Sequence, residues 1–387
     1  MNDDSVSKIR PANRPEGGEA MERSTQFEDD LGPAKIVHVH EPSVGLRAVV
    51  VIDNVAAGPS IGGVRMAPDV STEECFRLAR AMTFKNAAAS LPHGGGKSVI
   101  SADPRMPAEE KQRLIRAFAG AIGDLNDYIP GPDMGTDETC MAWVKDEIGR
   151  AVGLPREIGG IPLDEIGATG FGVAVAAEVA QGFCGMDLEG ARVAVQGFGS
   201  VGIHAAAFLA GKGAVLVAAA DSGGTIVNPH GLDLEGLAAH KAAGGNVSGF
   251  PGGEALDRDA VIDADCEIWI PAARPDIIHA DNVARLRAKL VIEGANIPVT
   301  PEAEQALHDS GVLCIPDFIA NAGGVICGAT EYHDGTQTAA FQAIEEKIRA
   351  NTEQVLRESA GRAIPPRQAA LEMADRRVRQ AMAYRRW

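Results

Sequence analysis

The chain has 387 residues, 45% of them hydrophobic, and a formal net charge of −17. Its length predicts two domains, or three. The negative charge argues against nucleic acid or an anionic membrane surface as the main partner, because neither attracts a net anion. A small molecule is therefore the expected ligand.

The sequence contains no apolar run long enough to span a membrane and no signal-peptide core near its start. Its six cysteines are scattered without a C-x-x-C pair, which indicates neither a zinc site nor a disulfide framework. His38 and His40 would share a strand face, but no third ligand accompanies them, and we expect no metal. These features predict a cytoplasmic protein with reduced thiols.

The first part of the chain mixes strands and helices behind a polar segment. Residues 1–25 are rich in Pro and Gly, and we predict a disordered tail there. In the first helix Cys75, Ala79 and Met82 recur at helical spacing. The elements predicted are strands over 34–42 and 46–54, a helix over 72–91, a strand over 97–103 that follows a glycine-rich loop, and a helix over 107–125.

The segment LPHGGGKSVI, residues 91–100, resembles the end of a phosphate-binding P-loop. A P-loop needs a glycine five positions before the glycine that precedes its lysine, and Leu91 stands there instead. Lys97 therefore needs another role. Most lysines are solvated at the protein surface, and this is the ordinary interpretation of Lys97 and of Lys85, which lies late in the predicted helix. The alternative is a partly dry cleft, in which two close ammonium groups lower each other's proton affinity and one can act as a base.

Asp133 lies between prolines and glycines in IPGPDMGTDE, residues 129–138, in a rigid turn ahead of a helix. One interpretation is a helix cap or turn aspartate, and Thr136 competes for the capping role. The other is a functional carboxylate. Spacing alone leaves both open.

From about residue 165 strands and helices alternate, which predicts a parallel sheet covered on both faces. The chain over 336–387 is expected to be helical, with the helix over 345–387 packing back on the first domain or on another subunit. The predicted elements before it are helices over 168–183 and 200–213 and strands over 191–197, 214–221, 266–272, 289–295 and 312–317.

The segment QGFGSVG has the G-x-G-x-x-G spacing, with Gly197, Gly199 and Gly202. An apolar strand ends on it, a helix begins on it, and the next strand ends in Asp221, as a dinucleotide-binding fold requires. Ser200 and Val201 complete the predicted turn. Because no arginine or lysine directly follows Asp221 to meet an extra phosphate, NAD is favoured over NADP.

Seven motifs occur along the chain, in the order GPSIGGVRM, MTFKNAAASLPHGGGKSVI, PGPDMGT, ATGFGV, QGFGSVG, EGANIP and PDFIANAGGVI. In this order they resemble the motifs of the glutamate/leucine/phenylalanine/valine dehydrogenases, and the resemblance covers roughly residues 35 to 385. It implies an α/β fold with two domains and reversible oxidative deamination of an L-amino acid to a 2-oxo acid and ammonia. The implied domains are a substrate-binding and oligomerisation domain over 26–165 and a Rossmann-type NAD-binding domain over 166–344. A homo-oligomer is also implied.

The same resemblance implies roles for individual residues. Lys97 is the implied catalytic lysine, and Asp133 is the acid that handles the protons of the amine. Lys85 and the backbone at Gly62 and Gly63 bind the α-carboxylate. The other positions are a pocket wall at Met82 and polar groups beside the nicotinamide at Thr169, Asn296 and Asn321.

The side-chain pocket decides which amino acid reacts. In the glutamate-specific relatives that this chain resembles, a lysine and a serine hold the γ-carboxylate of the substrate. Ile61 and Gly328 occupy those two positions here. Burying a carboxylate there without a counter-charge costs several kcal/mol. Ile61, Gly131, Val325 and Gly328 therefore predict a pocket for an apolar side chain, with the two glycines leaving room for a bulky one.

Two alternatives stay open at the level of sequence. The first is glutamate dehydrogenase with another group on the γ-carboxylate, since EGANIPVTPEAE and ATGFGV resemble the glutamate branch. The second is a non-catalytic NAD-binding sensor, against which the presence of Lys85, Lys97 and Asp133 argues.

Overall fold

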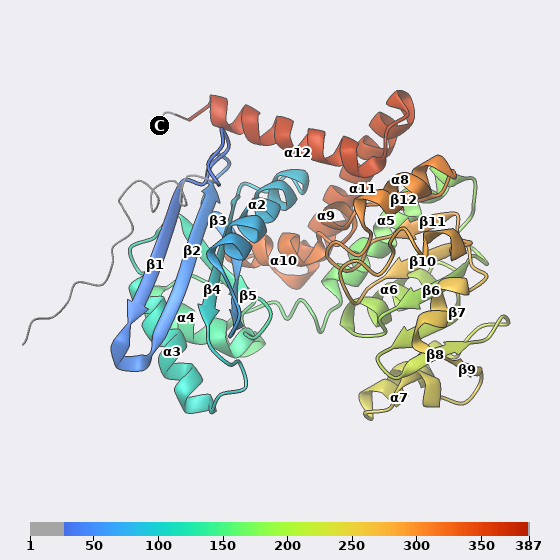
Figure 1. The fold of residues 1–387 in the computed structure, drawn as a ribbon, viewed down its shortest axis with the longest axis horizontal. Helices are drawn as coiled ribbons and strands as arrows, with labels where there is room; N and C mark the ends of the chain where they lie inside the picture. The colour runs from blue at the N-terminus through green and yellow to red at the C-terminus, as the bar shows by residue number, and fades with distance from the viewer. Residues whose placement is uncertain (1–26, 386–387) are drawn as a thin grey trace, which may run out of the picture.

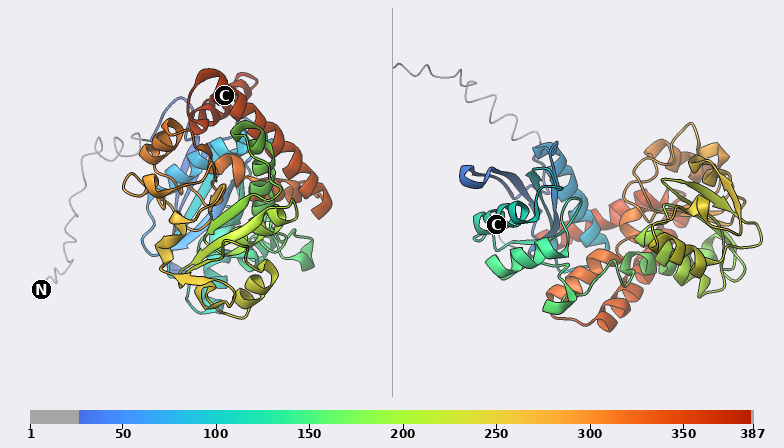
Figure 2. Two further views of the ribbon diagram at one scale, coloured as in Figure 1. Left: turned by 90° about the vertical axis from the view of Figure 1, so that its right-hand side faces the viewer. Right: turned by 90° about the horizontal axis from the view of Figure 1, so that it is seen from below.

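A computed structural model describes residues 27–385 and shows two α/β lobes, each built on its own sheet (Figures 1 and 2). The predicted tail at 1–25 lies outside the described residues. Within the described chain all six cysteines are free, and five are buried. No described helix has both the length and the apolar character needed to cross a membrane.

The first sheet has the order β1-β2-β4-β3-β5. β1, β2 and β4 are antiparallel neighbours, whereas β3 pairs in parallel with β4 and β5. Its strands are β1 (Lys35–Glu41), β2 (Leu46–Asn54), β3 (Ser60–Ala67), β4 (Gly94–Ser101) and β5 (Tyr128–Pro132). Its helices are α2 (Thr72–Ala88), α3 (Ala108–Ala121) and α4 (Glu138–Ile148).

Alternating apolar residues of β2 supply both faces of this sheet. Val50 and Ile52 pack with Leu114 and Phe118 of α3, while Val51 packs on the other face with Cys75 of α2. This period of two is what a strand buried on both sides requires. The sheet is therefore held between α2 on one face and α3 with α4 on the other.

The glycines before Lys97 were predicted to form a loop, and this prediction is wrong, because Gly94–Gly96 are the first residues of β4. Gly95 lies directly beneath α2, where a side chain would collide with the Thr83 backbone. A side chain on Gly96 would press on Ser60 and Tyr128. Glycine is a poor strand former, but here it lets the helix approach the strand closely.

The second sheet has the order β12-β11-β10-β6-β7-β8-β9, and β12 to β7 are parallel, as the alternation predicted. The antiparallel β8 and β9 at its edge were not predicted, because they are short and follow paired glycines. The strands are β6 (Arg192–Gln196), β7 (Val215–Asp221), β8 (Gly224–Val227), β9 (Glu254–Leu256), β10 (Ile268–Pro271), β11 (Leu290–Ile292) and β12 (Leu313–Ile315).

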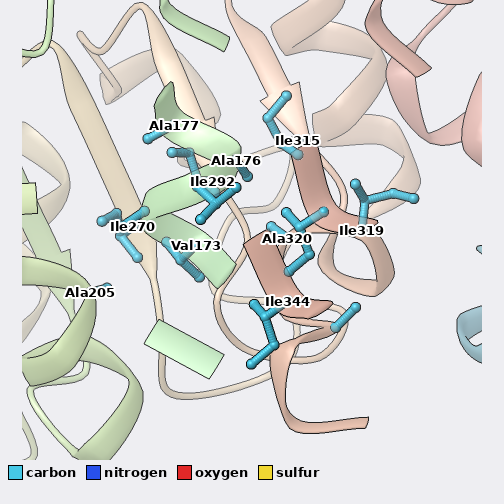
Figure 3. Close-up of a cluster of buried hydrophobic side chains, with 14 of the residues drawn as sticks. Val173, Ala176, Ala177, Ala205, Ile270, Ile292, Ile315, Ile319, Ala320 and Ile344 are labelled. Atoms are coloured by element: carbon cyan, nitrogen blue, oxygen red, sulfur yellow. The ribbon is translucent and has the colours of Figure 1, made fainter. Parts of the chain in front are cut away.

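Helices cover both faces of the second sheet. The helices are α5 (Ala168–Cys184), α6 (Ser200–Ala210), α7 (Leu234–Ala242), α8 (Pro301–Asp309), α9 (Asp317–Ala320) and α10 (Gly323–Tyr332). Figure 3 shows Val173 and Ala176 of α5 gathered with Ile270, Ile292 and Ile315 of the sheet. On the opposite face Trp269 packs with residues of α8.

The chain continues in two long helices, α11 (Gln337–Arg362) and α12 (Pro366–Ala383). α11 packs on α5, and α12 returns to α2 of the first lobe (Figure 1). Arg377 of α12 donates hydrogen bonds to the carbonyl oxygen of Ala88 (2.7 Å) and to Asn351 Oδ1 (2.9 Å). It thereby binds the otherwise free carbonyl end of α2.

Candidate active site

A cleft of about 820 Å³ opens between the two lobes. Its walls come from β3, β4 and α2 on one side and from α5, the segment after β11, and α10 on the other. The cleft brings together residues that lie more than 200 positions apart. The predicted site residues that line it are Ile61, Gly62, Gly63, Met82, Lys85, Lys97, Gly131, Asp133, Thr169, Val201, Asn296, Asn321, Val325 and Gly328.

Lys97 projects from β4 with only 7% of its side chain exposed. Its Nζ contacts Asp133 Oδ2 directly. Burial, followed by the positive charge of Arg65, lowers the pKa of Lys97 to about 7. Lys85 also lowers this pKa, but less than Arg65 does. The sequence interpretation named Lys85 as the cationic neighbour and thus missed the larger contribution.

Lys85 lies late in α2, and its Nζ donates a hydrogen bond of 2.6 Å to Asn321 Oδ1. Asn321 in turn donates to the carbonyl oxygen of Ala295 (3.1 Å) and to Asn296 Oδ1 (3.0 Å). Burial lowers the pKa of Lys85. This chain of hydrogen bonds spans the cleft and fixes the ammonium group beside the predicted nicotinamide positions.

Asp133 follows β5, and neither it nor Thr136 caps α4, because Asp137 does so by accepting from the Cys140 backbone N–H (2.9 Å). The Asp133 carboxylate therefore faces Lys97 with its Oδ2 atom, while its Oδ1 atom accepts from the Met134 backbone N–H and lies near Arg65. Gly63 permits this placement, since a side chain there would press on the Asp133 side chain. The Thr136 hydroxyl instead accepts from the Asp133 backbone N–H (3.0 Å) and holds the turn.

The end of the cleft predicted to take the substrate side chain is apolar, with Ile61 and Val325 in its wall. Val152, which was not predicted from the sequence, lies between Gly131 and Gly328, the two glycines expected to leave room for a bulky substrate side chain. Its Cγ2 would be 3.0 Å from a Cβ on Gly131 and 3.6 Å from one on Gly328. The space is therefore smaller than two facing glycines suggest, and Val152 limits it.

The charged groups of the cleft are unevenly distributed. Among the described residues that line it, the cationic side chains are Lys85 and Lys97, whereas four carboxylates are present. Lys85 and Lys97 are already bonded to Asn321 and Asp133. No further cation is available in this lining for a second carboxylate on a substrate. The carboxylates are Asp133, Asp137, Glu138 and Asp164.

A second cavity, of about 410 Å³, lies at the carboxyl ends of β6 and β7 and contains Gly197, Gly199 and Asp221. Gly197 has φ +96°, a conformation that favours glycine. A side chain on Gly202 would collide with the Gly197 carbonyl, so this glycine lets α6 approach β6 closely. Gly202 and Ser200 line neither cavity, and the Ser200 hydroxyl donates to the Asp164 carbonyl oxygen (3.0 Å).

Asp221 has a cationic neighbour, contrary to the expectation from the residues that directly follow it in the sequence. Lys241 Nζ lies 2.5 Å from Asp221 Oδ2, and Arg258 and Arg274 line the same cavity. Lys241 and backbone N–H groups lower the pKa of Asp221 despite its partial burial. The immediate sequence neighbours of Asp221 could not show this, because Lys241 comes from α7, twenty residues later.

Two family models match the chain. The model for Glu/Leu/Phe/Val dehydrogenase, dimerisation domain, matches residues 33–150, and the model for Glutamate/Leucine/Phenylalanine/Valine dehydrogenase matches residues 159–386. Glutamate dehydrogenase of Thermotoga maritima is 42% identical over 300 residues, 74% of this chain and 72% of that protein. The NAD-specific glutamate dehydrogenase of Staphylococcus aureus is 36% identical over 86% of this chain and 85% of that protein.

Solved structures resemble the whole fold. The hetero-hexameric glutamate dehydrogenase of Thermus thermophilus, in its leucine-bound form, has a TM-score of 0.81 at 29% identity and covers 97% of this chain and 100% of that one. L-tryptophan dehydrogenase of Nostoc punctiforme has a TM-score of 0.73 at 23% identity, covering 93% and 99%, which shows a shared fold alone. The chain belongs to the glutamate/leucine/phenylalanine/valine dehydrogenase family of amino acid dehydrogenases.

Proposed function

We propose that this protein catalyses the reversible NAD-dependent oxidative deamination of an apolar L-amino acid, of the leucine, valine or phenylalanine type, to its 2-oxo acid and ammonia. The observation that carries the proposal is the contact of Lys97 with Asp133 in a cleft whose far end presents Ile61 and Val325. A base and an acid beside an apolar pocket suit this chemistry.

The residues of the cleft divide the work. Lys85 exchanges Asn321 for the substrate α-carboxylate, with the backbone of Gly62 and Gly63 beside it. A bound nicotinamide supplies the acceptor for the hydride that leaves the α-carbon. Asp133 takes a proton from the substrate ammonium, so that loss of the hydride gives an iminium. The neutral Lys97 amine then takes a proton from water as the water oxygen adds to the iminium carbon. Asp133 returns its proton to the amine nitrogen, and ammonia departs as the new hydroxyl group gives its proton to the Asp133 carboxylate and becomes the carbonyl of the 2-oxo acid. The resulting Lys97 ammonium stabilises negative charge that develops beside it.

The second cavity fits the dinucleotide. Gln196 Oε1 is buried without a hydrogen-bond partner and lines this cavity, so a polar ligand there would satisfy it. Gly199 faces open space, which leaves its backbone accessible to a pyrophosphate. We propose NAD, with the Asp221 carboxylate accepting from the ribose hydroxyls. The positive charge of Lys241 compensates the negative charge of Asp221. We therefore expect the enzyme to discriminate less strongly against NADP than it would with an aspartate that had no cationic neighbour.

Glutamate dehydrogenase is the second candidate, because relatives of that name match most of the chain. The charge distribution in the cleft favours the apolar substrate. A γ-carboxylate at the Ile61 end would meet no free cation among the described lining residues, and Asp137, Glu138 and Asp164 add negative charge to the same lining. Desolvating such a group without a partner costs several kcal/mol.

We also infer the division of labour between the lobes: a substrate-binding and oligomerisation domain over 26–165, and a dinucleotide-binding domain over 166–344. The match of residues 33–150 to a dimerisation domain supports a homo-oligomer.

A panel of L-amino acids tests the function. Leucine, valine, phenylalanine and glutamate are each supplied with NAD or NADP, and the absorbance of the reduced cofactor is followed. The expected result is a kcat/KM for at least one apolar substrate that exceeds the value for glutamate by tenfold or more. A higher value for glutamate would establish the second candidate. Binding of NAD without turnover of any amino acid would indicate a sensor.

A further inference from the structure

Arg65 is a residue of the cleft region to which the sequence motifs assign no role. It lies on β3, two positions after Gly63, and 21% of its side chain is exposed. Its Nη2 lies 3.3 Å from Asp133 Oδ1, and its Nη1 lies 2.6 Å from Glu74 Oε1. The guanidinium thus holds two carboxylates at once, one of which contacts Lys97 through its other oxygen.

The Glu74 side chain binds Arg65 and does not make the backbone hydrogen bond that is usual for a glutamate at its position in a helix. Ser71 caps α2 by accepting from the Glu74 backbone N–H (3.1 Å), and the S-x-x-E spacing is that of a capping box. In a capping box the glutamate side chain returns to the backbone N–H of the cap residue. Here it binds Arg65 instead. The start of α2 therefore fixes one arm of the guanidinium, which leaves the other arm directed at Asp133.

The charges around Lys97 act in opposite directions. The nearby Asp133 carboxylate favours the ammonium form of Lys97, whereas burial and Arg65 favour the neutral amine. Arg65 acts in two ways, since its charge repels an ammonium and its ion pair with Asp133 weakens the attraction of that carboxylate. A guanidinium suits this place because it stays charged and can bridge two carboxylates.

We propose that Arg65 is a positioning residue, which holds the Asp133 carboxylate beside the Lys97 amine and, by its own positive charge, opposes protonation of that amine. The inference rests on the proposed roles of Lys97 and Asp133. The other groups that face Lys97 are Cys75, Glu74 and Lys85, all from α2. Of these, Glu74 favours the ammonium and Lys85 opposes it, whereas Cys75 is a neutral thiol, because burial raises its pKa to about 12.

Labelling of Lys97 at a series of pH values tests this without any substrate. An amine-reactive acylating reagent modifies the neutral form, and peptide mass spectrometry gives the extent of modification at Lys97. In the wild type we expect a midpoint near pH 7. Arg65→Met should raise the midpoint by about one pH unit or more, which lowers the neutral fraction at pH 7 roughly fivefold. Glu74→Gln should lower the midpoint, because it removes a negative charge that favours the ammonium form of Lys97.

Arg65→Lys separates charge from geometry. It keeps the positive charge but cannot bridge both carboxylates, so the midpoint should stay closer to the wild-type value than in Arg65→Met, while kcat for the preferred amino acid falls. Circular dichroism and thermal unfolding verify that each variant is folded. An Arg65→Met protein that is folded and has an unchanged labelling midpoint would overturn the inference. So would a rise in Glu74→Gln as large as that in Arg65→Met.

The two readouts distinguish this inference from the proposed function. If Arg65→Met moves the labelling midpoint but the wild type turns over no amino acid, the electrostatic role stands and the proposed reaction is wrong. If the wild type turns over an apolar amino acid and both the midpoint and the acidic limb of its pH profile are unchanged in Arg65→Met, the reaction stands and the role of Arg65 is wrong.

Discussion

Replacement of Ile61 by lysine tests the structural basis of substrate choice. Ile61 is 4% exposed on β3 and belongs to the apolar end of the cleft. Ile61→Lys removes apolar contact equivalent to one or two buried methylene groups of a leucine side chain, about 0.8–1.6 kcal/mol. It also offers a γ-carboxylate a charged hydrogen bond worth about 1.5–3 kcal/mol. Together these terms predict a change of roughly 2–5 kcal/mol in the preference for glutamate over leucine.

The assay is kcat/KM for both amino acids with the same cofactor. A change of about 2 kcal/mol corresponds to about thirtyfold in the ratio, so we expect at least that shift toward glutamate. Ile61→Met is the matched control, since it has similar length and no charge, and it should leave glutamate a poor substrate. A folded Ile61→Lys protein whose ratio equals that of Ile61→Met would refute the assignment of Ile61 to the substrate side chain.

Four further predictions follow from the site. Turnover of the wild type should rise through pH 7, because the neutral form of Lys97 is the base and its pKa is lowered to about 7; a steady-state pH profile with no inflection between pH 6 and 8 would contradict this. Lys97→Ala should lose at least a hundredfold in kcat while its NAD affinity, measured by calorimetry, stays within twofold of the wild type. Val152→Ala should improve kcat/KM for phenylalanine relative to valine by about tenfold, because it opens space between Gly131 and Gly328; an unchanged ratio would place the side chain elsewhere. Asp221→Ala should weaken NAD binding by about tenfold and NADP binding by less. Equal losses of affinity for the two cofactors would contradict the proposed contact between Asp221 and the ribose.

The parts of the site that sequence could predict are those carried by local motifs. Lys85, Lys97 and Asp133 stand in motifs whose order resembles a known family, and the structure places all three in one cleft. The helix-turn geometry at Gly197 was also predictable, because strand, glycines and helix follow one another directly in the chain.

The parts that sequence could not predict depend on contacts between distant segments. Arg65 reaches Asp133 across 68 positions, and Lys241 reaches Asp221 from another element. Val152 lies between two glycines that are 197 positions apart (328 − 131). No periodicity or composition encodes such a contact. The strand at Gly94–Gly96 was missed for a related reason: the propensity of glycine is overridden by the close approach of α2.

The return of α12 to the first lobe has a consequence for biosynthesis and for engineering. Carbonyl groups at the end of α2 receive their donor from Arg377, which leaves the ribosome only after the entire second lobe. The amino-terminal lobe, although it is translated first, therefore cannot complete its packing until residues 366–383 have been made. A chimera that exchanges nucleotide-binding lobes between relatives must retain residues 366–383 from the same parent as α2, or the joint between the two halves will be mismatched.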